Sequence, residues 1–173
     1  MERRAGPGRR GGAPSIGLYA VAAARALGAS EVVYVDAGEE RARVAEALGA
    51  RAVVERARAD SRLGRFPVTV DASATAEGLG LALASTDVEG TCTSVGIYLG
   101  DVALPLFELY TRGVRFVTGR VNARAELPGV LAALAERTLR IESVVTARAG
   151  WDEAADAWLA PATKLVVARQ VSA

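Results

Sequence analysis

Two stretches decide the fold of this sequence: Gly11-Gly12-Ala13-Pro14-Ser15-Ile16-Gly17 and Glu31-Val-Val-Tyr-Val-Asp36. Between them, residues 15–27 place apolar side chains on one helical face, and Gly28 follows as a helix stop. A glycine-rich turn allows a phosphate to approach the helix N-terminus, where free N–H groups and the helix dipole favour an anion. The order of turn, helix and strand therefore predicts the start of a nucleotide-binding α/β unit.

The alternation of strands and helices continues along the chain. Short β-branched runs alternate with helical patterns of roughly ten residues, which predicts βαβ units and a parallel sheet. We expect an α/β fold of the Rossmann type, a doubly wound parallel sheet in three layers. Residues 55–65 are polar and rich in arginine, and we interpret them as a loop or a frayed helix. The other expected strands cover residues 51–54, 68–71, 90–95, 114–117 and 164–168, and residues 142–146 are expected to be extended. The other expected helices cover residues 39–48, 75–85, 104–112, 125–136 and 151–159.

The composition excludes several kinds of chemistry. The 173 residues include no His and one Cys, which excludes a His general base, a Ser-His-Asp triad, a His-ligated metal and a Cys-rich zinc site. We therefore expect no catalytic and no metal-binding residue in this chain. A single Cys and the absence of a secretory pattern at the start favour a cytoplasmic protein. No apolar run approaches the roughly 20 residues that a membrane span needs, so we expect no membrane partner.

Positive charge gathers at the start of the chain. Residues 1–12 hold four Arg and one Glu, a net charge of +3, whereas the whole chain carries +1. The rest is therefore slightly acidic with both signs mixed, which is not typical of a nucleic-acid-binding protein. We interpret residues 1–11 as a basic disordered head and residues 12–173 as a dinucleotide-binding domain.

An acidic residue ends the strand that follows the first helix. Asp36 lies 19 residues after Gly17, where a carboxylate accepts hydrogen bonds from the adenosine ribose and repels a 2′-phosphate. This position favours NAD over NADP. The glycine motif is imperfect, because Pro14 stands at its middle position, and an Asp that caps the next helix would give the same pattern. The combination of turn, helix, strand and Asp36 favours nucleotide binding over that structural alternative.

Small and polar residues follow three later strands, at the ends where open parallel sheets bind ligands. The three runs are Asp71-Ala72-Ser73, Val95-Gly96-Ile97-Tyr98 and Thr118-Gly119-Arg120. Each run alone is typical of a tight turn, but their recurrence favours a cofactor that lies across the strand ends. Arg120 and Arg124 are candidate partners for a pyrophosphate, although an arginine at such a position is more often a solvated surface residue.

These segments resemble the cofactor-binding domain of the medium-chain, zinc-type alcohol dehydrogenases. The likeness covers about residues 12–170. It implies the NAD-binding portion of an alcohol or polyol dehydrogenase, which transfers a hydride between an alcohol and NAD. The likeness is carried by Pro14-Ser-Ile-Gly-Leu-Tyr-Ala-Val-Ala-Ala-Ala-Arg-Ala-Leu-Gly-Ala29, Val-Val-Tyr-Val-Asp36, Glu46-Ala-Leu-Gly-Ala50, Val70-Asp-Ala-Ser73, Ser94-Val-Gly-Ile97, Leu127-Pro-Gly-Val-Leu131, Trp151-Asp-Glu-Ala-Ala155 and Lys164-Leu-Val-Val167.

The resemblance also implies which residues contact the cofactor. Asp36 would hold the adenosine ribose, Arg41 would lie near the adenine, and Arg124 would contact a phosphate. A homo-oligomer is implied through the edge strand around Val114–Val117. The remaining implied contacts are Gly12, Ser15, Ile16 and Gly17 at the pyrophosphate, Ala72 and Ser73 on the adenosine side, and Gly96, Ile97 and Tyr98 near the nicotinamide.

The sequence departs from this family at its start. We expect the family's catalytic zinc domain to be absent from this sequence, and zinc to be bound only in that domain. The segment Met1-Glu-Arg-Arg-Ala-Gly-Pro-Gly-Arg-Arg10 has no β pattern where a central strand should precede the glycine turn. We therefore expect an incomplete domain without its first strand, from a truncated product, a start inside a longer gene or a frameshift, and inactive alone. Two alternatives stay open: a Rossmann enzyme of the S-adenosylmethionine type, and a non-catalytic nucleotide-binding or remnant fragment.

Overall fold

The computed structural model describes residues 15–54 and 63–169 of the chain. The strand pairs in these residues are all parallel, as the alternation of strands and helices predicts. The described residues form two compact units. One unit comprises residues 63–120, and the other comprises residues 15–54 together with residues 121–169.

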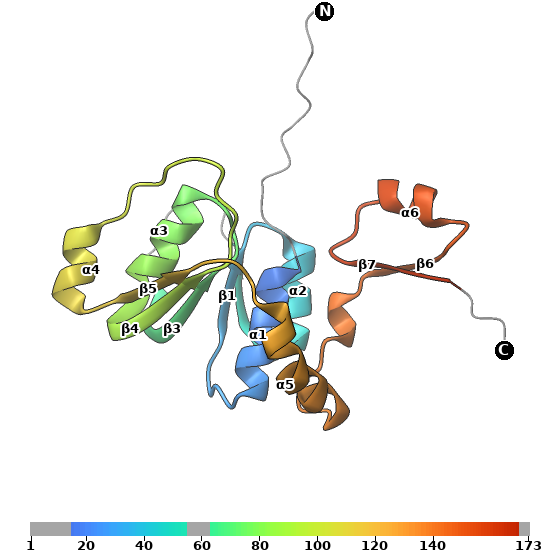
Figure 1. The fold of residues 1–173 in the computed structure, drawn as a ribbon, viewed down its shortest axis with the longest axis horizontal. Helices are drawn as coiled ribbons and strands as arrows, with labels where there is room; N and C mark the ends of the chain where they lie inside the picture. The colour runs from blue at the N-terminus through green and yellow to red at the C-terminus, as the bar shows by residue number, and fades with distance from the viewer. Residues whose placement is uncertain (1–14, 55–62, 170–173) are drawn as a thin grey trace, which may run out of the picture. The chain divides into compact units, whose positions relative to one another are not determined.

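The unit of residues 63–120 is a parallel sheet in the order β3-β4-β5 with two helices, drawn in green and yellow in Figure 1. Its core joins apolar side chains of both helices, Leu79, Leu83 and Leu109, to Cys92 in the middle strand. Burial of this kind supplies most of the stability of short helices, which are marginal alone. The elements are β3 (Phe66–Asp71), α3 (Ala76–Ala84), β4 (Thr86–Ser94), α4 (Leu106–Arg112) and β5 (Arg115–Thr118).

Strand β4 is longer than the sequence predicts. The predicted strand began at residue 90, but β4 begins at Thr86, and its pairing with β3 shifts between Phe66 and Val68. Glu89 adopts a φ of 56° inside this irregular stretch. At Gly90 a Cβ atom would lie 2.9 Å from two backbone carbonyl oxygens, so only glycine fits there. The glycine therefore marks a bulge within the strand, and the sequence pattern had placed the start of the strand at that bulge.

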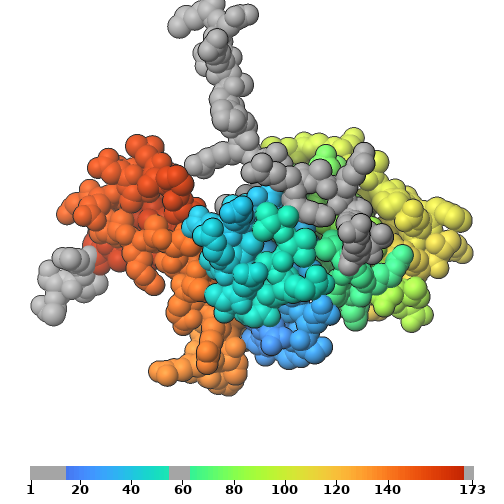
Figure 2. Space-filling model, turned by 180° about the vertical axis from the view of Figure 1, so that it is seen from behind, coloured from blue at the N-terminus to red at the C-terminus, as the bar shows by residue number. Residues whose placement is uncertain are grey.

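The unit of residues 15–54 and 121–169 contains two pairs of parallel strands, β1 with β2 and β6 with β7. Its core gathers Leu18 and Val21 from the first helix around Tyr34 of β1, with Ala45 and Val144. Figure 2 shows α1 and α2, in blue and cyan, at the surface of this unit. The elements are α1 (Ile16–Ala26), β1 (Val33–Asp36), α2 (Glu39–Ala47), β2 (Arg51–Val54), α5 (Ala123–Ala135), the 3-10 helix η2 (Glu142–Val144), β6 (Ala147–Gly150), α6 (Ala154–Leu159) and β7 (Leu165–Ala168).

The prediction of an extended segment at residues 142–146 is wrong for residues 142–144. Residues 142–144 form the 3-10 helix η2, and the strand β6 begins at residue 147. Val144 is fully buried in the core beside Leu18, so its apolar character serves tertiary packing and not a strand face. The predicted loop at residues 55–65 lies largely outside the described residues. The other predicted helices and strands are found with ends displaced by a few residues.

Candidate functional site

Asp36, at the C-terminal end of β1, has its carboxylate held from several sides. Its Oδ1 accepts a hydrogen bond from the backbone N–H of Gly38 at 2.8 Å, and its Oδ2 accepts one from the Tyr34 hydroxyl at 2.8 Å. The guanidinium of Arg41 donates to both oxygens, with Nε 2.8 Å from Oδ2 and Nη2 bonded to Oδ1. Strand, turn and the first turn of α2 thus converge on one carboxylate.

The local sequence explains this convergence. An Asp readily accepts a hydrogen bond from the N–H two residues on, and Gly38 begins α2 in an extended conformation. The missing side chain at Gly38 leaves room for Arg41, because a Cβ atom there would lie 2.6 Å from the Arg41 Nη2. Two residues apart on a strand, Tyr34 and Asp36 share one face, so the tyrosine hydroxyl reaches the carboxylate.

These contacts fix the protonation of the group. Burial would raise the pKa of Asp36, but the hydrogen bonds from Arg41, Tyr34 and Gly38 outweigh burial and hold this pKa below its ordinary value of 3.8. Burial and the bond to Asp36 raise the pKa of Tyr34, and the bond to Asp36 raises the pKa of Arg41. At neutral pH, Asp36 is therefore a charged acceptor between two protonated donors.

A second carboxylate organises the strand ends of the unit of residues 63–120. Asp71 ends β3 and is only 2% exposed. Its Oδ1 accepts from the backbone N–H of Ser73 at 3.0 Å and from the Ser73 hydroxyl at 2.6 Å. Its Oδ2 accepts from the hydroxyls of Ser94 at 2.7 Å and Tyr98 at 2.6 Å. The ends of β3 and β4 are thus tied together through one buried anion.

Hydrogen bonds also keep the Asp71 carboxyl group ionised. Burial would raise the pKa of Asp71, but the bonds from Ser73, Tyr98 and Ser94 hold it below 3.8. Burial and the bond to Asp71 raise the pKa of Tyr98 to about 12. Tyr98 is therefore a protonated donor at neutral pH.

The two loops after β3 and β4 touch at a glycine. A Cβ atom at Gly96 would lie 2.9 Å from the Cα and N atoms of Ala74, so the loops approach this closely only with glycine there. On the β3 side, the Ser73 hydroxyl accepts from the N–H of Thr75 at 3.1 Å. The Thr75 hydroxyl in turn caps α3 by accepting from the N–H of Gly78 at 3.1 Å.

Ala74 lies beside this contact with a φ of 53°, in the left-handed region. A residue with a Cβ atom in this region destabilises the folded state by about 1–2 kcal/mol. Replacing it with glycine removes this cost, but the greater freedom of glycine in the unfolded chain offsets about 0.5–1 kcal/mol of the gain. We expect Ala74→Gly to raise the free energy of unfolding by about 0.5–1 kcal/mol, measured by urea denaturation. Ala72→Gly, at a position without a positive φ, is the matched control and should destabilise. A loss of stability in both variants would contradict the prediction.

The predicted site residues fall in both units. The structure brings Asp36 and Arg41 together, and it joins Ser73 to Tyr98 through Asp71. Tyr34 and Ser94 are not among the predicted site residues, and Asp71 is predicted only as part of the run that follows its strand. Gly12 lies outside the described residues. Of the others, Ser15 and Gly17 lie at the start of α1 with the exposed Ile16, Ala72 is half-buried, Ile97 is exposed, and Arg124 is exposed in α5.

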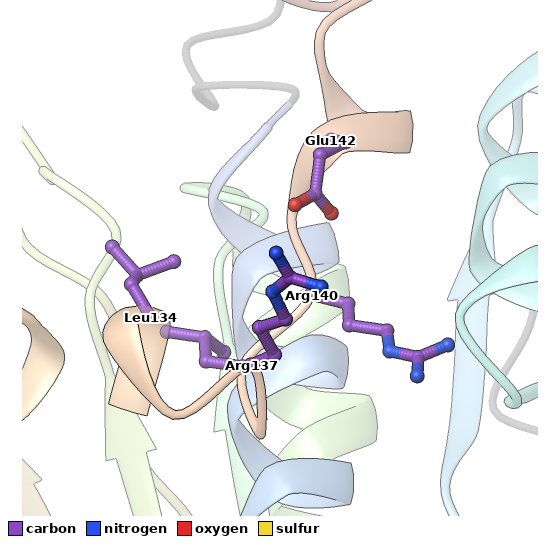
Figure 3. Close-up of a pocket in the computed structure, with 5 residues that line it drawn as sticks. Leu134, Arg137, Arg140 and Glu142 are labelled. Carbon is purple, nitrogen blue, oxygen red and sulfur yellow. The ribbon is translucent and has the colours of Figure 1, made fainter. Parts of the chain in front are cut away.

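A surface pocket of about 470 Å³ lies at the C-terminal end of α5, and none of the predicted site residues lines it (Figure 3). Leu134, Arg137, Leu139, Arg140 and Glu142 line it. Within residues 15–54 and 63–169, no group of three or more His, Cys, Asp or Glu side chains is placed to hold a metal ion. The helices of these same residues are too short or too polar to cross a bilayer.

The chain is similar to known dehydrogenases. Residues 15–136 match the family model described as zinc-binding dehydrogenase. An alcohol dehydrogenase of Geobacillus stearothermophilus is 30% identical over 131 residues, covering 72% of this chain and 39% of that protein. Sorbitol dehydrogenase of Rattus norvegicus is 28% identical over 157 residues, covering 85% of this chain and 44% of that protein. The solved alcohol dehydrogenase TADH from Thermus sp. ATN1 is 28% identical with a TM-score of 0.75, covering 85% of this chain and 45% of that one.

The match to this family model identifies the family of the chain. The chain spans less than half the length of the curated relatives it matches. Its structural neighbours are alcohol dehydrogenases of the Rossmann type, which confirms the predicted fold class. The family model covers most of the chain, from residue 15 at the start of α1 to the end of α5. The chain therefore belongs to the zinc-binding dehydrogenase family and corresponds to its C-terminal NAD(P)-binding domain.

Proposed function

We propose that this chain binds NAD as the cofactor portion of a medium-chain alcohol or polyol dehydrogenase, an enzyme that transfers a hydride between an alcohol and NAD. One observation carries the proposal: a charged, oriented carboxylate at the C-terminal end of β1, supplied by Asp36. Open α/β folds bind ligands at this end of their strands, and a carboxylate there accepts the hydroxyls of the adenosine ribose. The residues present therefore fit the adenosine half of a dinucleotide.

The same carboxylate favours NAD over NADP. A 2′-phosphate would bring further negative charge close to the Asp36 carboxylate, which is ionised at neutral pH and only 19% exposed. We further propose, from the family resemblance, that Gly12, Ser15, Ile16, Gly17 and Arg124 meet the phosphates. Ala72 and Ser73 then lie on the adenosine side, and Gly96, Ile97 and Tyr98 near the nicotinamide.

The bound dinucleotide would supply the hydride acceptor. The family also uses a zinc site, which lies in its catalytic domain. The 173 residues include no His and one Cys. We therefore propose that zinc ligands come from residues outside this sequence and that this sequence alone does not oxidise alcohols. A cytoplasmic location stays a prediction, as does pairing of two copies along β5.

Calorimetric titration of the purified chain tests the proposal with three ligands: NAD, NADP and S-adenosylmethionine. We expect saturable NAD binding and weaker NADP binding. Asp36→Asn should weaken NAD binding about 10- to 100-fold, because hydrogen bonds to a charged group contribute about 1.5–3 kcal/mol each.

Asp152→Asn, at an exposed position in the same unit, is the matched control and should bind NAD as the unaltered chain does. Three outcomes would contradict the proposal: no binding of NAD, preference for S-adenosylmethionine, or an Asp36→Asn variant with unchanged affinity.

A further inference from the structure

The Asp36 carboxylate has no acceptor position to spare. A carboxylate offers about four lone-pair positions in its plane. In this structure the N–H of Gly38, the hydroxyl of Tyr34 and two nitrogens of Arg41 occupy them. The ribose hydroxyls of the proposed cofactor are also donors to this group. A donor already present must therefore leave before the ribose can bind.

The present donors differ in how freely they can leave. Tyr34 is 8% exposed and packs in the core beside Leu18 and Val21, so its hydroxyl is fixed by a buried ring. The N–H of Gly38 is backbone at the start of α2. The side chain of Arg41, by contrast, is 31% exposed, and that of Asp36 is 19% exposed. Because a partly exposed guanidinium regains water when it moves, Arg41 is the donor that can leave without disturbing the core.

We propose that the incoming cofactor displaces the guanidinium of Arg41 from Asp36, and that Tyr34 is the positioning residue that keeps this carboxylate oriented when Arg41 leaves. The inference rests on the proposed function, because the incoming ligand is the adenosine ribose. Two adjacent ribose hydroxyls replace the two guanidinium nitrogens, one on each carboxylate oxygen. The site therefore takes nucleotides with both hydroxyls free, whereas a 2′-phosphate lacks one of the two donors. Binding then requires an exchange of donors on Asp36.

A substitution at Gly38 can displace the guanidinium of Arg41 without replacing any charged residue. A Cβ atom at this position would lie 2.6 Å from Nη2 and 2.8 Å from Cζ of Arg41. The backbone of Gly38, with φ −106° and ψ 115°, is open to alanine. Gly38→Ala therefore pushes the guanidinium away from Asp36 and leaves Asp36, Tyr34 and the charge of Arg41 in place.

Calorimetric titration with NAD compares the unaltered chain with three variants. Gly38→Ala should tighten NAD binding by about 3- to 10-fold, because no donor must be displaced. Tyr34→Phe should weaken NAD binding by about 5- to 10-fold, because Asp36 loses a donor that orients its carboxylate; this is less than the full energy of the bond, which is present without ligand as well. Tyr19→Phe is the matched control, since Tyr19 packs against the same core, and it should change nothing. Circular dichroism verifies that all three variants fold.

The titration of Asp36 without ligand shows whether Tyr34 acts by orienting this carboxylate or only by packing in the core. Tyr34→Phe keeps the buried ring and removes only the hydroxyl. The carboxyl resonance of Asp36, assigned by comparison with Asp36→Asn, should titrate at a higher pH in Tyr34→Phe than in the unaltered chain. An unchanged titration would overturn the role of Tyr34, and unchanged or weaker NAD binding in Gly38→Ala would overturn the role of Arg41. No NAD binding by the unaltered chain would remove the proposed function and this inference together, whereas NAD binding equal in all variants would remove the inference alone.

Discussion

Replacing Asp71 by Ala should lower the free energy of unfolding of this chain by about 3 kcal/mol. The carboxylate is buried, and it accepts hydrogen bonds from Ser73, Ser94 and Tyr98. Truncation leaves these donors without their acceptor, and each buried donor left unsatisfied costs about 1–3 kcal/mol before water and local movement recover part of it. Urea denaturation followed by circular dichroism measures the loss. Asp71→Asn, which keeps the volume and one acceptor oxygen, should lose less.

The pH dependence of the stability of Asp71→Ala gives a second test of the role of this carboxylate. Because the native pKa of Asp71 is held below its ordinary value of 3.8, the carboxylate contributes stability above about pH 4, and this contribution is lost as the pH falls through the lower native value. The difference between the unaltered chain and Asp71→Ala should therefore shrink in acid. A difference that stays constant down to low pH would show that lost packing, and not the charge, accounts for the effect.

Leu18→Ala should cost about 3 kcal/mol, within the range of about 2–5 kcal/mol for buried leucines. Leu18 has no exposed surface and packs with Val21 and Tyr34 in the core of its unit. Leu27, directly after the same helix, is 89% exposed. Leu27→Ala is therefore the matched control and should change stability by no more than about 0.5 kcal/mol. Similar losses in the two variants, measured by urea denaturation, would contradict the assigned core.

The sequence predicts well those elements that local signals determine. Helix α1 was expected at residues 15–27 and runs from Ile16 to Ala26, because apolar periodicity and a following glycine define it locally. The extended conformation predicted for residues 142–144 is wrong because Val144 is apolar for a non-local reason, its burial in the core around Leu18. A short apolar run does not distinguish a strand from a single buried turn.

The candidate site divides in the same way. Asp36 is predictable from its spacing after the glycine motif, which is a local property, whereas Arg41 follows only from the family resemblance. Tyr34 could have been found too, because a residue two positions before Asp36 on a strand shares its face. The bonds of Asp71 to Ser94 and Tyr98 span 23 and 27 residues, and only the pairing of β3 with β4 brings these groups together.

The buried thiol in β4 has a consequence for following the motions of this chain. Cys92 is the only cysteine in the sequence, it is fully buried in the middle strand of its sheet, and burial raises the pKa of its thiol. A thiol reagent therefore reacts with the native chain only during the moments when this strand is open to solvent. The rate of alkylation measures how often the unit of residues 63–120 opens, so the protein carries a natural reporter of its own fluctuations.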